Sequence, residues 1–133
     1  MKNKKCINDK DELDRIARVV SEYTEISLER LQHKTRKEEV KDARQIAMHF
    51  MEKKTKASLL YIAQHFGRKD HSVTINARDR VQDLMDVDRK FKKMCLEIET
   101  LIDEAIERER TKYKYHFEFN NNLEIYQEQK NQL

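Results

Sequence analysis

The chain has 133 residues, including no proline and a single glycine, and 40% of its residues are charged. This length fits one domain of ordinary size, and the near absence of proline and glycine excludes folds built on hairpin turns or on a Gly/Pro-rich linker. Apolar residues nevertheless recur at helical spacing, so disorder does not describe the bulk of the chain. The composition predicts an all-α fold.

Positive charge is concentrated in the middle of the chain. Residues 31–80 contain twelve Lys or Arg and six Asp or Glu, whereas the net charge of the whole chain is only +3. Such an excess suits a polyanionic partner, and a mixed solvated surface is the alternative. There is no secretory signal and no apolar run of membrane-spanning length, and Cys6 and Cys95 lie far apart in the sequence. We therefore expect a cytoplasmic protein with reduced thiols, associated with the nucleoid if the polyanion is DNA.

Helical periodicity predicts about six helices. The first starts near Asp9 or Asp11, and Ser27 caps a short helical turn that follows it. Residues 33–37 contain no apolar side chain and are predicted to form an exposed basic loop. A long helix over residues 38–54 follows this loop, with acidic residues in its first turn and lysines in its last turn, as the helix dipole favours.

Two further helices meet at the only glycine, Gly67. Ser58 caps the first of them, which ends at Phe66, and Asp70 caps the second. The arrangement predicts a helix-turn-helix from Ser58 to Leu84. In that motif the first turn of the second helix meets base edges in the major groove of DNA.

The C-terminal part of the chain leaves two alternatives open. A final long helix begins at Asp86 or Asp88, and its apolar residues keep a four-three spacing that suits either coverage of its own domain or a coiled-coil seam. Aromatic residues over 113–119 then alternate with polar residues, which predicts a strand or an extended aromatic arm. We expect a domain over residues 1–110 and a flexible or oligomerising extension over residues 111–133. The seam residues are Val87, Phe91, Met94, Ile98, Leu101 and Ala105.

The first turn of the second helix carries side chains suited to base edges. Asp70 can accept a hydrogen bond from a cytosine amino group, and Val73 can contact a thymine methyl group. His71 and Ser72 can bond base edges or phosphate. The alternative is an ordinary helix start, with a capping Asp followed by solvated residues.

Residues 65–77, His-Phe-Gly-Arg-Lys-Asp-His-Ser-Val-Thr-Ile-Asn-Ala, resemble the signature of the C-terminal DNA-binding domain (domain IV) of the bacterial replication initiator DnaA. That signature runs roughly Phe-Gly-Gly-Arg-Asp-His-Thr-Thr-Val. The likeness extends to the basic loop at 34–37 and to Ala-Arg-Gln-Ile-Ala-Met at 43–48, and it covers about residues 13–101. It implies a helix-turn-helix of the Trp repressor type and sequence-specific binding to duplex DNA in the control of replication or transcription.

The resemblance also implies roles for individual residues. Asp70, His71 and Ser72, followed by Val73, fall where the family contacts bases in the major groove. Arg36 falls where a basic-loop arginine enters the minor groove, whose negative potential favours a cation. The residues expected to contact phosphate are Lys34, Lys37, Arg44, Gln45, Arg68 and Lys69.

Three positions depart from the family pattern. Val73 replaces a threonine, which keeps a methyl group but loses a hydroxyl. Lys69 replaces the usual arginine, so a bidentate contact becomes a point charge. Glu38 stands where some members carry a basic residue, and its carboxylate would repel phosphate. We therefore expect duplex DNA as the partner without assigning the exact DnaA box as the target.

The sequence also argues against catalysis. A phosphate-binding loop of the form G-x-x-x-x-G-K-[ST] needs two glycines, so we expect neither a nucleotide site nor the ATPase of the complete initiator. The histidines and cysteines show no metal-ligand spacing, and no nucleophile–base arrangement is present. We expect no cofactor, no metal and no catalytic residue.

Other partners remain as alternatives. A homodimer could form through the C-terminal helix or the aromatic arm. The main rival to DNA binding is a helical protein–protein interaction module whose basic loop is merely solvated. A repressor that senses a small molecule is a third reading, but the sequence shows no ligand-binding residues for it.

Overall fold

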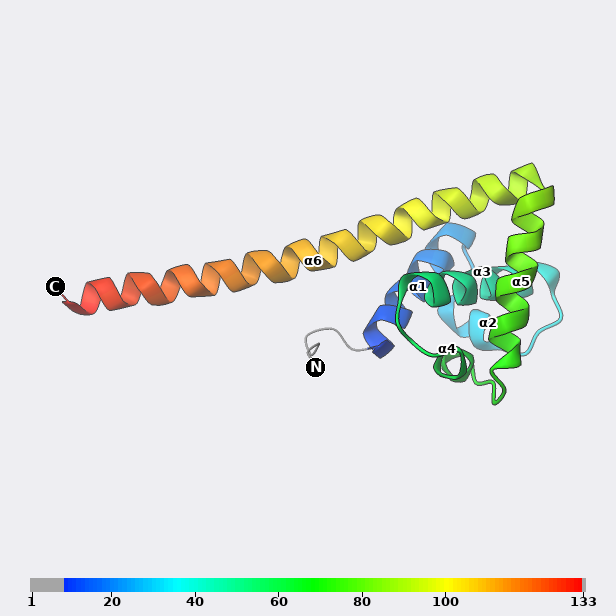
Figure 1. Ribbon diagram of the computed structural model, residues 1–133, viewed down its shortest axis with the longest axis horizontal. Helices are drawn as coiled ribbons and strands as arrows, with labels where there is room; N and C mark the ends of the chain where they lie inside the picture. Colours follow the sequence, from blue (N-terminus) through cyan, green and yellow to red (C-terminus); the bar gives the residue numbers. More distant parts are fainter. Residues whose placement is uncertain (1–8, 133) are drawn as a thin grey trace. The chain divides into compact units, whose positions relative to one another are not determined.

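The computed structural model describes the backbone of residues 9–132 and the side chains of residues 10–112 and 114. All regular structure in this range is helical, which confirms the predicted all-α class (Figure 1). The chain divides into two compact units, residues 1–102 and residues 103–133. The helices are α1 (Asp9–Thr24), α2 (Leu28–Gln32), α3 (Glu38–Lys54), α4 (Leu59–His65), α5 (Ser72–Val87) and α6 (Arg89–Gln132).

Short polar side chains begin the helices at predicted positions. Ser58 Oγ accepts a hydrogen bond from the amide of Tyr61 at 3.0 Å, which starts α4. Asp88 Oδ1 accepts hydrogen bonds from the amides of Lys90 and Phe91, which start α6. These bonds satisfy amides that have no partner within the first turn of a helix.

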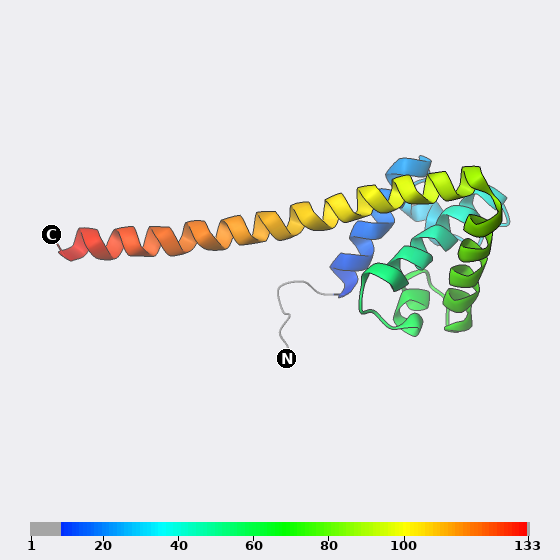
Figure 2. The same ribbon diagram turned by 45° about the horizontal axis from the view of Figure 1, so that its top comes forward.

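Helix α3 is the centre of the first unit. It contacts α1, α2, α4 and α5, which gather around it in both views (Figures 1 and 2). Every residue from Ile46 to Met51 is buried, so this part of α3 is covered on all sides. A helix that is buried all round has to pack against several neighbours at once. Helix α3 therefore brings together α1 and α2, which precede it in the sequence, and α4 and α5, which follow it.

The first turns of α6 cover the core of their own unit. Cys95, Ile98 and Ile102 are each 0% exposed. Val87, the first residue of the predicted coiled-coil seam, is 82% exposed and belongs to α5. Asp88 interrupts the two helices with an extended backbone, so the four-three spacing does not run along one continuous helix. Of the two alternatives, the residues up to Ile102 support coverage of the domain.

The prediction of an extended aromatic arm is wrong. Residues 113–119 were predicted to be extended from their alternating pattern, but their backbone is α-helical within α6. A strand needs a neighbouring strand to satisfy its backbone polar groups, and the described residues contain none. A helix satisfies those groups within the segment itself, and the Lys-, Glu- and Arg-rich residues before it are good helix formers. The aromatic side chains lie outside the described residues, so an oligomerising role for them stays a prediction.

Helix α6 has 44 residues, which is ample for a membrane span. Neither α6 nor any other helix, within the described residues, combines sufficient length with sufficient apolar character to cross a bilayer.

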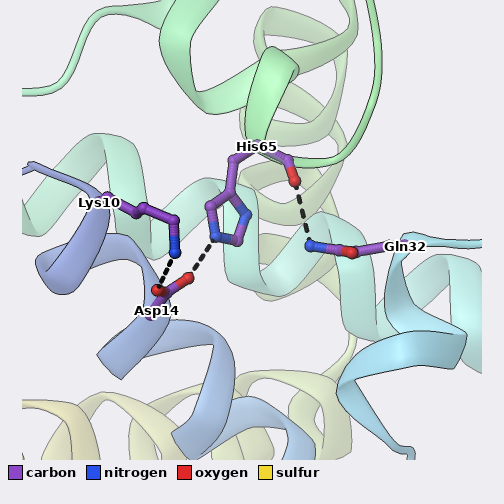
Figure 3. Close-up of polar contacts among 4 residues, drawn as sticks. All are labelled: Lys10, Asp14, Gln32 and His65. Carbon is purple, nitrogen blue, oxygen red and sulfur yellow. Dashed lines mark hydrogen bonds and ion pairs between the residues drawn. The ribbon is translucent and has the colours of Figure 1, made fainter.

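A polar cluster joins α1 to the end of α4 (Figure 3). His65 Nε2 lies 2.9 Å from Asp14 Oδ1, and Lys10 Nζ lies 3.0 Å from Asp14 Oδ2. Gln32 of α2 donates to the backbone carbonyl of His65 at 3.1 Å. Burial opposes ionisation of Asp14, but the hydrogen bonds from His65 and Lys10 lower its pKa from the ordinary value of 3.8. The cluster holds the last residue of α4 directly before the turn.

Candidate DNA-binding surface

Backbone hydrogen bonds close the turn between α4 and α5. The amide of Gly67 donates to the carbonyl of Gln64, and the amide of Arg68 donates to the carbonyl of Ala63, both at 2.9 Å. This pair of bonds is a Schellman motif, which needs a residue in the left-handed conformation after the helix. Gly67 supplies that conformation with a φ of +72°. The only glycine of the sequence therefore stands where the helix-turn-helix requires one.

Thr74 joins the first turns of α4 and α5. Its side chain is fully buried, and Thr74 Oγ1 donates to the carbonyl of Leu59 at 2.9 Å. No role was predicted for this residue from the sequence. The signal was available, because Thr74 precedes the buried Ala77 and Val81 at helical spacing of three and seven residues.

Helix α5 begins one residue later than a cap at Asp70 predicts. His71 occupies the N-cap position without a side-chain cap, and Asp70 Oδ1 accepts a hydrogen bond from the amide of Ser72 at 3.0 Å. Hydrogen bonds from the backbone and side chain of Ser72 lower the pKa of Asp70. Asp70 and His71 are exposed, whereas Ser72 and Val73 are half-buried. The start of α5 thus offers an ionised acceptor and an imidazole to solvent.

Arg44 is buried at the base of the basic loop, where it holds the backbone. Its Nε donates to the carbonyl of Leu31 at 2.6 Å, and its Nη2 donates to the carbonyl of His33. Burial lowers the pKa of Arg44, and the nearby charge of Arg68 lowers it further. Arg44 therefore shapes the start of the loop. Its expected contact with phosphate stays a prediction.

The basic loop, α3, the turn and the start of α5 line an open hollow of about 360 Å³. Six of the eleven residues predicted to contact DNA line this cationic hollow, and they come from segments far apart in the sequence. Five of the described lining residues are Lys or Arg, and none of them is Asp or Glu. Such a concavity attracts anions. The lining consists of Lys34, Thr35, Arg36, Lys41, Arg44, Gln45, Met48, Arg68 and Val73.

The other predicted residues flank the cationic hollow in the sequence. Lys37 follows Arg36 in the loop, and Lys69 follows Arg68 in the turn. Residues 70–72 directly precede Val73, which lines the hollow. Val73, in the first turn of α5, and Arg36 therefore line the same hollow, and the exposed Asp70 and His71 precede Val73 by three and two residues.

Lys41 is a lining residue for which no role was predicted from the sequence. Lys41, Arg44, Gln45 and Met48 follow one another at spacings of three, one and three residues along α3. This is the spacing of one helix face. Lys41 could therefore have been predicted from the two polar residues already assigned to that face.

Arg80 of α5 contacts the same end of α3. Arg80 Nη1 donates to Gln45 Oε1 and lies 2.7 Å from Asp42 Oδ1. Arg80 Nη2 lies 3.1 Å from Glu38 Oε1. The carboxylate of Glu38, expected to repel phosphate, is thus paired with a cation of the protein itself.

Known proteins share this region of the chain. The chain is similar to the chromosomal replication initiator protein DnaA of Flavobacterium psychrophilum, with 44% identity over 86 residues, 65% of this chain and 18% of that protein. It is 34% identical over 90 residues to DnaA of Bacteroides thetaiotaomicron, covering 68% of this chain and 19% of that protein. The chain therefore spans about a fifth of the length of these curated relatives.

A solved structure has a similar fold. It is described as the crystal structure of a DNA replication initiation factor, and it matches with a TM-score of 0.63 and 32% identity over 75% of this chain and 30% of the other. The family model described as bacterial dnaA protein helix-turn-helix matches residues 13–81, which is more than half of the chain. These residues include the basic loop, α3, the turn and every residue of the cationic hollow. The chain belongs to the helix-turn-helix family of bacterial DnaA proteins.

Proposed function

We propose that this chain binds duplex DNA sequence-specifically through the cationic hollow and the exposed start of α5. The observation that carries the proposal is the hollow itself, with five cationic side chains and no carboxylate among its described lining residues. Phosphate contacts from such cations supply affinity and fix the register of a protein on DNA, whereas contacts to base edges supply specificity.

The residues of the proposed site make two kinds of contact with DNA, to the grooves and to phosphate. Asp70, His71 and Ser72 bond base edges in the major groove, with Val73 against a thymine methyl group. Arg36, exposed on the basic loop, enters the minor groove. Phosphate is contacted by Lys34, Lys37, Arg44, Gln45, Arg68 and Lys69.

The proposed role is regulation of DNA replication or transcription on the nucleoid. The relatives are chromosomal replication initiator proteins, which favours a site in a replication origin or a gene control region. The sequence has one glycine and therefore no phosphate-binding loop of the two-glycine type. The proposed contacts with DNA involve no nucleotide cofactor.

Titration of labelled duplexes tests the proposal. A duplex that the protein selects from a random pool serves as the specific target, and a scrambled duplex of equal length serves as the reference. The logarithm of the affinity should fall linearly with the logarithm of the salt concentration, by about 0.9 for each phosphate neutralised. If the protein binds no duplex even at low salt, the interaction-module alternative holds.

Single variants separate the proposed roles. Arg36→Ala and His71→Ala should each cost about 1–3 kcal/mol on the selected duplex and relax the preference over the scrambled one. Lys69→Ala should weaken both duplexes to a similar extent. Lys92→Ala, which removes an exposed cation from α6, is the matched control and should leave both affinities unchanged. Equal losses on both duplexes for Arg36→Ala and His71→Ala would contradict the assignment of roles.

A further inference from the structure

Arg80 has its positive charge already paired within the protein. Its Nη1 lies 2.7 Å from Asp42 Oδ1, its Nη2 lies 3.1 Å from Glu38 Oε1, and its side chain is 32% exposed. A guanidinium held between two carboxylates is a weak ligand for a further anion, since its charge is compensated. Arg80 is therefore not equivalent to the exposed cations of the basic loop.

The chemistry of Arg80 restricts the amide of Gln45. A guanidinium carries only hydrogen-bond donors, so only the oxygen of the Gln45 amide can face it. Arg80 Nη1 does donate to Gln45 Oε1. The NH2 group of the same amide then has to turn away from Arg80, and Gln45 lines the cationic hollow.

We propose that Arg80 is a positioning residue, which orients Gln45 so that its NH2 group donates to a DNA phosphate in the cationic hollow. This inference rests on the proposed function. Without Arg80 the terminal amide torsion of Gln45 is loosely restrained, because rotation about such a bond has broad minima. The amide oxygen, which repels phosphate, then faces the hollow as readily as the NH2 group.

Asp42 and Glu38 complete the arrangement by fixing Arg80. Both lie on α3, Asp42 three residues and Glu38 seven residues before Gln45, so the two acids and the amide belong to the same helix. Arg80 comes from α5, the helix whose first turn carries the proposed base contacts. The contact between Arg80 and Gln45 therefore links the side-chain orientation of Gln45 on α3 to the packing of α5 against α3.

A double-mutant cycle on the selected duplex tests this role. Arg80→Ala and Gln45→Ala should each weaken binding about tenfold. In the Gln45→Ala background, Arg80→Ala should cost less than about threefold, because residues acting through one contact are not additive. A full tenfold loss from Arg80→Ala in both backgrounds would mean that Arg80 acts directly or through its net charge, and would overturn the proposal. An unchanged affinity for Gln45→Ala alone would also overturn it.

Arg78→Ala is the matched control. Arg78 is also an arginine of α5 that contacts an acid of α3, since its Nη1 lies 3.4 Å from Glu52 Oε1, but it does not line the cationic hollow. Its loss should leave affinity within about twofold of the unmodified chain. Thermal unfolding verifies that each variant is folded. If Arg80→Ala does not fold, Arg80→Lys replaces it in the same cycle, because lysine keeps the charge but lacks the two-nitrogen fork.

Different results would overturn the proposed function and the role of Arg80. Salt-dependent binding of the unmodified chain to duplex together with an additive cycle would overturn only the role of Arg80. Absence of duplex binding by the unmodified chain would overturn the proposed function, and the role of Arg80 with it.

Discussion

Two polar side chains of α3, Arg44 and His49, are buried where apolar residues usually pack. Arg44 is 7% exposed and His49 is 6% exposed. Arg44 donates to two backbone carbonyls, whereas His49 Nδ1 is buried without a hydrogen-bond partner. Burial without a partner disfavours a charged or polar group, so the two residues affect the free energy of unfolding in different ways.

Arg44→Ala should lower the free energy of unfolding by about 1–3 kcal/mol, because it removes charge-assisted hydrogen bonds to the carbonyls of Leu31 and His33. It should also weaken DNA binding, since the basic loop loses its attachment to α3. Urea unfolding and duplex titration measure the two effects. Arg36→Ala, on the exposed part of the same loop, should reduce affinity without changing the unfolding midpoint. An unchanged midpoint for Arg44→Ala would contradict the loop-holding role.

His49 should make the unfolding free energy depend on pH. Burial lowers its pKa from the ordinary value of 6.5, with a further contribution from the charge of Lys53. The unfolded chain therefore binds a proton at a higher pH than the folded chain does. The contribution of His49 to the free energy of unfolding should be fully present above pH 6.5. It should decline as the pH falls from 6.5 toward the pKa of His49 in the folded chain, by about 1.4 kcal/mol for each unit by which folding lowers that pKa.

His49→Phe isolates this contribution. The variant keeps a ring beside Phe50, whose ring centroid lies 4.9 Å from that of His49. Urea unfolding at several pH values should show a smaller slope below pH 6.5 than in the unmodified chain. The same slope in both proteins would assign the pH dependence to other groups.

At the scale of elements, the helix-turn-helix depends on how α4 stops and α5 starts. The Schellman motif at Gly67 ends α4, the buried Thr74 hydroxyl attaches α5 to α4, and the His65–Asp14 pair attaches α4 to α1. These polar contacts add to the packing of α4 and α5 against each other and against α3.

Gly67→Ala should lower the free energy of unfolding by about 1–2 kcal/mol, because an L-residue resists a positive φ. A Cβ at this position would meet no heavy atom within 4 Å, so the cost comes from the backbone and not from a clash. Gly67→Asn should cost less, since asparagine tolerates the left-handed conformation better. Urea unfolding measures both variants. Equal losses for Ala and Asn would indicate a cause other than backbone conformation.

At the scale of the whole chain, the proposed DNA contacts fall within one of the two units. All residues of the cationic hollow lie between Lys34 and Val73, within the unit of residues 1–102. The unit of residues 103–133 contains the rest of α6. Residues 31–80 carry an excess of six positive charges, whereas the net charge of the whole chain is +3 because the remaining residues are net acidic.

A chain shortened to residues 1–110 should keep its DNA affinity within about twofold, because the core and the hollow lie before this point. Duplex titration and thermal unfolding of both lengths measure this. Sedimentation of the two chains also tests the homodimer alternative, since self-association of the full chain alone would assign the dimer contact to residues 111–133. Loss of binding or of folding in the shortened chain would contradict the proposed division.

Much of the fold could be predicted from the sequence because its causes are local. Ser58 and Asp88 begin helices by bonding amides three or fewer residues away, and Gly67 ends a helix through its own backbone conformation. Such interactions can be predicted from the residue types near the ends of each helix. The alternation over residues 113–119 was a weaker indication, and the intrinsic preference of the surrounding helix formers outweighed it.

The sequence by itself thus determined the all-α class, the helix-turn-helix and, through resemblance, the identities of the proposed contact residues. Only the tertiary structure decided that Arg44 is buried beneath the loop, that Lys41 joins the hollow, and that Arg80 holds Gln45 from 35 residues away. The physical reason is the distance along the sequence over which each interaction acts. Caps and turns act within one helical turn, whereas these contacts exist only after α3 and α5 pack together, and periodicity shows which face of a helix is buried but not which side chain it meets.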